Sequence, residues 1–77
     1  MTNSKDDLKL LPLATMEKII KKISPDLRVS EDAKEALREY LEQEAYELSK
    51  IASEFAIHAK RRTIKSEDIR LAAKNKK

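Results

Sequence analysis

The chain has 77 residues and no cysteine, and 40% of its residues are charged, with a formal net charge of +3. So short a chain forms one domain with a small core, and without disulfides it needs a metal or a partner chain for ordinary stability. A single histidine, His58, is too little for a zinc site, and charge interrupts every apolar stretch. We therefore expect a soluble intracellular protein without a metal or a membrane span, supported by a partner chain.

Two breaks flank the first predicted helix. Pro12 fits the first turn of a helix but not its interior, and apolar residues at helical spacing follow over residues 13–23. Ser24-Pro25 ends this helix, because the residue before a proline disfavours helical backbone. We expect residues 1–10 to be a flexible or partly ordered arm that precedes the folded domain.

The longest predicted helix spans residues 30–59, where neither glycine nor proline occurs. Its apolar side chains recur every three or four residues and form one continuous stripe. Ser30 is a good N-cap, and Glu31 and Asp32 follow in the first turn, where the helix dipole favours anions. Such a helix is roughly 45 Å long, which is longer than a domain of this size is wide. The rest of the chain is too small to cover the stripe alone.

Basic residues mark the end of the long helix, and a short third helix follows. Residues 60–62 suit the negative C-terminal end of the helix dipole. The β-branched pair at 63–64 favours a short extended segment, and residue 65 or 66 caps the final helix. Residues 75–77 are expected to be a frayed basic end. The predicted fold class is all-α, in the order short helix, loop, long central helix, loop, short helix.

Charge is sorted along the chain. Residues 1–30 carry six basic and four acidic side chains, and residues 31–59 carry three basic and eight acidic ones. Residues 60–77 carry eight basic and two acidic side chains. Positive charge thus lies at both ends of the central helix and negative charge along its body. A randomly charged surface would not be sorted in this way, although a lysine-rich tail that only aids solubility remains the alternative.

Three segments, in this order, resemble the archaeal histones of the histone-fold family. HAKRRTIKSEDIRLA, at residues 58–72, is similar to the archaeal pattern H-A-G-R-K-T-I-K-x-E-D-I-x-L-A. LPLA with KIIK resembles the opening helix, and RVSEDA resembles the first loop and the entry to the long helix. The resemblance runs from about residue 11 to 73. It implies that residues 11–77 are a histone-fold domain with a basic C-terminal end, in an intertwined head-to-tail dimer.

The resemblance implies that the protein binds, wraps and compacts double-stranded DNA, largely without sequence specificity and without a cofactor. Arg28 and Thr63 are similar to a pair of loop residues whose arginine enters a minor groove; a surface arginine near Asp26 is the alternative. The other implied DNA-binding residues are Lys18, Lys21, Arg62 and Lys65, to which Lys22, Lys60 and Lys74 add charge. Lys60 stands where the family commonly has glycine, and we expect it to extend the long helix by one residue.

Two further sets of residues follow from the resemblance. Arg61 and Asp68 look like a structural salt bridge between the second loop and the final helix. Phe55, His58, Asp68 and Leu71 resemble the surface where one dimer meets the next, with His58 paired to an Asp68 across it. The alternative for His58 is a lone histidine on a partly apolar helix end.

The sequence has no glycine-rich phosphate loop, no nucleophile motif and no cluster of metal ligands, so we expect no enzyme and no catalytic residue. The carboxylates of the long helix are spaced as a solvated face. We expect a homodimer on the chromosome (nucleoid) in the cytoplasm, and leave open tetramers, longer assemblies on DNA and pairing with a paralogue. The main alternative is a histone-fold subunit of a transcription-regulatory complex with a heterologous partner. A plain helical dimerisation module is the second alternative.

Overall fold

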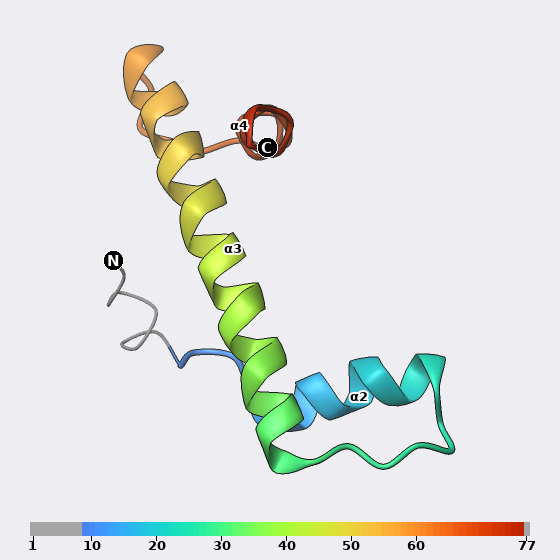
Figure 1. The fold of residues 1–77 in the computed structure, drawn as a ribbon. Helices are drawn as coiled ribbons and strands as arrows, with labels where there is room; N and C mark the ends of the chain where they lie inside the picture. Colours follow the sequence, from blue (N-terminus) through green and yellow to red (C-terminus); the bar gives the residue numbers. More distant parts are fainter. Residues whose placement is uncertain (1–8, 77) are drawn as a thin grey trace. The chain divides into compact units, whose positions relative to one another are not determined.

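The computed structural model describes residues 9–76. In this range the chain forms three helices, α2 (Leu13–Ile23), α3 (Glu31–His58) and α4 (Ser66–Asn75), and no strand (Figure 1). The predicted all-α class and the short, long, short order of the helices are confirmed. The chain divides into two compact units, a first unit of residues 1–43 and a second unit of residues 44–77. The arm predicted at residues 1–10 falls mostly outside the described range.

Helix α2 begins and ends at the predicted residues. Pro12, in extended backbone, precedes its first turn. At its end the N–H of Ser24 donates to the carbonyl of Ile20 at 2.9 Å. The N–H of Leu27 then donates to the carbonyl of Ser24 at 3.2 Å and closes a turn. The proline in that turn has no N–H to offer and a fixed φ, so the helix cannot continue through it.

The start of α3 is capped and tied to α2 within the first unit. The N–H of Ala33 donates to the Oγ of Ser30 at 3.1 Å, which is the predicted N-cap. The ammonium of Lys34 lies 3.2 Å from the Glu31 carboxylate and 3.4 Å from that of Glu17 on α2. The hydrogen bond to Glu31 is the main reason why the pKa of Lys34 is raised, and Glu17 adds to it. The contact with Glu17 thus joins α3 to α2, while the contact with Glu31 lies within α3.

The end of α3 differs from the sequence prediction. The helix ends at His58, and Lys60 has a positive φ of 59° instead of continuing it. The N–H of Lys60 donates to the carbonyl of Ile57, and that of Arg61 donates to the carbonyl of Ala56, both at 2.9 Å. These two bonds form a Schellman motif, in which the left-handed residue is usually glycine. A residue with a Cβ in this conformation costs about 1–2 kcal/mol.

Helix α4 is bound to α3 at its last residues. Its C-cap, Lys76, donates its backbone N–H to the carbonyl of Ala72 at 3.0 Å. The Lys76 ammonium lies 3.0 Å from Glu47 and 3.3 Å from Glu44, both on α3. Hydrogen bonds to Glu47 first, and then to Glu44, raise the pKa of Lys76. The predicted fraying is therefore wrong for Asn75, which is helical, and for Lys76; residue 77 lies outside the described range.

Few apolar side chains are buried in the described chain. The buried ones are Met16, Ala52, Ala56 and Ala72, of which only Met16 is large. Large apolar side chains stay exposed, among them Ile23 at 82% and Tyr40 at 77%. Within residues 9–76 a single chain therefore buries less apolar surface than a stable domain of this size needs. Within residues 9–76 no helix is both long and apolar enough to cross a membrane.

Candidate nucleic-acid interface

One ion pair holds the loop between α3 and α4. The Arg61 guanidinium donates to both oxygens of the Asp68 carboxylate, from Nη1 to Oδ2 and from Nη2 to Oδ1, each over 2.9 Å. Nη1 also donates to the backbone carbonyl of Thr63 at 2.9 Å. Two parallel bonds of this kind fix direction as well as distance. These are the two residues that the family resemblance paired, and they lie in direct contact.

Asp68 joins the loop to the first turn of α4. Its residue is only 3% exposed, and its Oδ2 accepts a further hydrogen bond, 2.7 Å long, from the backbone N–H of Lys65. Hydrogen bonds to the ionised form favour that form. The bond from Arg61, followed by that from Lys65, lowers the pKa of Asp68 to about 2. At neutral pH the charged carboxylate therefore binds the backbone N–H of Lys65 directly and holds Arg61, which in turn binds the carbonyl of Thr63.

The remaining side chains of this loop face solvent. Arg62, Thr63 and Lys65 are exposed. Neither Arg62 nor Lys65 forms an ion pair with any residue between 9 and 76. The structure thus brings three of the predicted DNA-binding residues together in one loop of the second unit. Asp68 binds the backbone N–H of Lys65, and Arg61 binds the backbone carbonyl of Thr63, while the positive charges of Arg62 and Lys65 stay available to an anionic partner.

The other three predicted DNA-binding residues belong to the first unit. Lys18 is exposed and Lys21 is half-buried, and their spacing puts them on one face of α2. Arg28 is exposed in the connector before α3 and forms no ion pair with Asp26 or any other residue from 9 to 76. The pairing of Arg28 with Thr63 concerns two chains and stays a prediction.

Three of the four residues predicted to join dimers line one hollow of the second unit. Phe55, Asp68 and Leu71 share it with Arg61, Glu67, Arg70 and Lys74. Leu71 is 48% exposed there, so an apolar side chain is available beside the buried carboxylate. His58 is exposed at the last turn of α3 and is not part of the lining. Its pairing with an Asp68 of another dimer stays a prediction.

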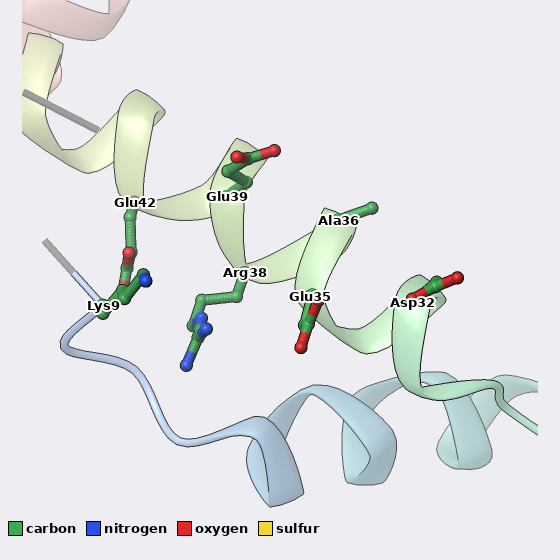
Figure 2. A pocket seen from close by; sticks show the side chains of 7 residues that line it. All are labelled: Lys9, Asp32, Glu35, Ala36, Arg38, Glu39 and Glu42. Atoms are coloured by element: carbon green, nitrogen blue, oxygen red, sulfur yellow. The ribbon is translucent and has the colours of Figure 1, made fainter. Parts of the chain in front are cut away.

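Glu42 is an anchor that the sequence interpretation missed. It is 5% exposed, and its Oε2 accepts the backbone N–H groups of Leu10 at 2.5 Å and Leu11 at 2.6 Å. In Figure 2 its side chain extends from α3 toward the segment that precedes α2. The prediction of a solvated acidic face is wrong for this residue. No signal in one sequence could find the contact, because its donors are backbone groups 31 and 32 residues away.

Glu42 also borders a hollow of mixed charge in the first unit. Figure 2 shows its lining residues, which are Lys9, Asp32, Glu35, Ala36, Arg38, Glu39 and Glu42. Although four of them are acidic, no group of three or more His, Cys, Asp or Glu side chains within residues 9–76 is placed to hold a metal ion. Arg38 and Lys9 offset part of the negative charge. The lining of this hollow therefore keeps an excess of two negative charges.

Comparisons with known proteins agree with the resemblance seen in the sequence. Residues 9–73 match the family described as histone-like transcription factor (CBF/NF-Y) and archaeal histone. The chain is 55% identical over 64 residues to one of the subunits of the archaeal histone HAN1 of Thermococcus zilligii, and the match covers 83% of this chain and 94% of that protein. It is 42% identical over 62 residues to probable archaeal histone 3 of Methanocaldococcus jannaschii, covering 80% of this chain and 91% of that protein.

Proposed function

The chain belongs to the family of histone-like transcription factors and archaeal histones, and from this premise we propose that its dimers wrap and compact double-stranded DNA largely without reading base sequence. The protein is a chromosome-associated, non-enzymatic DNA-binding histone with the histone fold. The proposal concerns the way in which it binds. Positive charge at the two loops neutralises phosphates, and Arg28 enters the minor groove.

The loop between α3 and α4 carries this proposal. Asp68 takes up the charge of Arg61 and binds the N–H of Lys65, so the loop is rigid before DNA arrives. Arg62 and Lys65 remain exposed. A rigid backbone with free cations loses little entropy on binding a phosphate backbone. Contacts of this kind position a protein on the duplex and carry no sequence information.

Three residues of the first unit complete the proposed interface. Lys18 and Lys21 contact phosphates from α2, and Arg28 inserts into the groove in the manner of the arginines by which histone octamers hold inward-facing minor grooves. The exposure of Arg28, without an ion pair among residues 9–76, supports this role. Preference among DNA sequences would then follow bendability, because wrapping costs energy that depends on the sequence being bent.

A second copy of the chain is the partner that the apolar surface requires. Exposed apolar side chains recur along α3 from Tyr40 to Ile57, and one large side chain, that of Met16, is fully buried in the described residues. Extensive apolar surface of this kind marks an interface. We propose a homodimer in which the long helices cross and cover each other, and dimers that join through Phe55, His58, Asp68 and Leu71.

A DNA-binding assay at several salt concentrations tests the mechanism. A protein that neutralises several phosphates loses affinity by orders of magnitude between about 50 and 200 mM salt. Binding that stays unchanged over this range would exclude phosphate neutralisation. Nuclease digestion of the complex then tests wrapping, because wrapped DNA is protected in fragments of defined length. Intact binding with no protected fragment would indicate that the protein bridges or coats DNA instead.

A second candidate is a histone-fold chain that pairs with a different chain. The HAN1 relative is named as one subunit of its histone, and the family description includes transcription factors. Sedimentation of the purified protein distinguishes the two, since one chain has a mass of 8.9 kDa. A folded species of twice that mass supports the homodimer. An unfolded or aggregated chain that only a second histone-fold chain rescues would support the heterologous assembly.

A further inference from the structure

Lys60, two residues after the last residue of α3, has a backbone conformation that suits glycine. Its φ is 59°, and its N–H is bound to the carbonyl of Ile57. The next N–H, that of Arg61, is bound to Ala56, so the left-handed turn is fixed on both sides. A non-glycine residue held in this region is destabilising, and such outliers cluster at binding and catalytic sites. The lysine side chain should therefore contribute something that the fold alone does not need.

The charges around Lys60 indicate what that contribution is. Of the cations in this loop, Arg61 is engaged by Asp68, while the side chains of Lys60, Arg62 and Lys65 are exposed. None of these three forms an ion pair with a residue in the range 9–76. Lys60 therefore neutralises no acidic group of its own described chain. It adds a third available cation to Arg62 and Lys65, on the side of the loop nearer to α3 in the sequence.

We propose that Lys60 is a further phosphate-binding residue of the DNA interface, held there by the left-handed end of α3. This inference rests on the proposed DNA binding and adds a contact that a glycine at the same position cannot make. An ammonium group on a flexible stem acts as a point charge and lacks the planar fork of arginine. Lys60 therefore binds the phosphate backbone and does not read bases. Lysine in place of glycine at this position therefore lowers the stability of the fold and raises its affinity for DNA.

Three substitutions of the full chain separate charge from backbone conformation. Lys60→Gly removes both the charge and the conformational cost, Lys60→Asn removes the charge and tolerates left-handed backbone, and Lys60→Arg keeps both. The matched control is Lys50→Ala, which removes an exposed lysine from the acidic body of α3. Each protein is melted without DNA, and its affinity for a duplex is measured by fluorescence anisotropy at several salt concentrations.

Lys60→Gly is expected to melt at a higher temperature than the parent protein and to bind DNA more weakly. Two lysines are lost per dimer, so the slope of log K against log salt should become less steep by about two. Lys60→Asn should show the same change in slope, while Lys60→Arg and Lys50→Ala should keep the parent slope. If Lys60→Gly retains the parent slope while the parent binds with steep salt dependence, the inference is wrong and the proposed function stands. If the parent itself binds without salt dependence, both are wrong.

Discussion

The Arg61 guanidinium donates two hydrogen bonds of 2.9 Å to the Asp68 carboxylate, and the same carboxylate accepts a hydrogen bond of 2.7 Å from the backbone N–H of Lys65. Only the ionised carboxylate can accept all three bonds, because a protonated one presents an O–H donor. The loop and the start of α4 therefore depend on a single charge. This dependence couples the conformation of a proposed DNA-binding loop to pH.

Replacing Asp68 by asparagine should lower the melting temperature at neutral pH and make the fold less sensitive to acid. The pKa of Asp68 is about 2 in the folded chain against 3.8 for the free group. As the pH falls, the unfolded chain therefore takes up the proton first, and the stabilisation by ionised Asp68 is lost between about pH 4 and pH 2. The difference in melting temperature between parent and Asp68→Asn should be constant above this window and shrink within it, as measured by circular dichroism.

Glu54→Gln serves as the control for Asp68→Asn. Glu54 is an exposed carboxylate on α3 in the same unit. Its loss should leave the melting curve near that of the parent at every pH, because an exposed charge without a fixed partner contributes little. A gap between parent and Asp68→Asn that persists unchanged down to pH 2 would contradict the role assigned to this carboxylate.

Removing the Glu42 side chain should release the segment before α2. In Glu42→Ala the N–H groups of Leu10 and Leu11 lose their common acceptor, so their amide hydrogen exchange should accelerate, as NMR can measure. Glu42→Gln keeps a side-chain oxygen and should give an intermediate rate. Glu39→Ala removes a neighbouring exposed carboxylate and should change neither amide. Unaltered exchange in Glu42→Ala would show that the anchor is not formed in solution.

The bounds of α2 could be predicted from the sequence because local chemistry determines them. Pro12 and the Ser24-Pro25 pair exclude helix on either side, and Ser30 supplies the side-chain cap of α3. The end of α3 could not be predicted in the same way. Lysine favours helix at Lys60, but the two backbone bonds of the Schellman motif override that preference.

Contacts between distant parts of the chain can be predicted only where a family pattern carries them. Arg61 and Asp68 could be paired because their spacing matches a known motif. Two other contacts join residues that are far apart in the sequence. Glu42 accepts a hydrogen bond from the backbone N–H of Leu10, and the flexible ammonium group of Lys76 pairs with Glu47. Neither contact leaves a periodic or compositional signal, so the sequence alone indicates a solvated face for Glu42 and a frayed end for Lys76.

Met16→Ala should be the most destabilising truncation in the first unit. Met16 is 1% exposed and is the one large side chain that is fully buried among the described residues. Truncating a buried methionine to alanine costs about 2–5 kcal/mol through lost burial and a residual cavity. Urea unfolding should report this loss at a fixed protein concentration, since the stability of a dimer depends on concentration. The exposed neighbour Thr15 is the control, and Thr15→Ala should change the free energy of unfolding by less than about 0.5 kcal/mol.

His58→Ala should weaken the assembly of dimers into larger complexes and leave the formation of each dimer unchanged. His58 is exposed in the last turn of α3, one helical turn from Phe55, which lines the hollow shared with Asp68 and Leu71. Loss of the imidazole would remove a polar contact between dimers and leave the interface within each dimer intact. Sedimentation should show unchanged dimers without DNA, and nuclease digestion should show shorter protected fragments. Protection as long as that given by the parent would exclude His58 from the contact between dimers.

Arg28→Ala should weaken DNA binding and leave the fold intact. Arg28 is exposed and forms no ion pair in the described chain, so its loss should shift the melting temperature far less than Met16→Ala does. In the proposed homodimer two arginines are lost, and the salt slope of DNA binding should become less steep by about two. Arg28→Lys keeps the charge but not the planar group, so it should restore the slope without restoring the full affinity.

Arg38→Ala is the matched control for Arg28, because it removes an arginine from the acidic first half of α3 (Figure 2). That side chain lies among carboxylates, where a DNA backbone would be repelled, so the variant should bind DNA with the parent slope. Equal slopes for the parent, Arg28→Ala and Arg38→Ala would exclude Arg28 from the interface. A melting temperature in Arg28→Ala as low as that of Met16→Ala would instead assign this arginine to the fold. Lower affinity with an unchanged melting temperature, in Arg28→Ala alone, is the result that insertion into a minor groove requires.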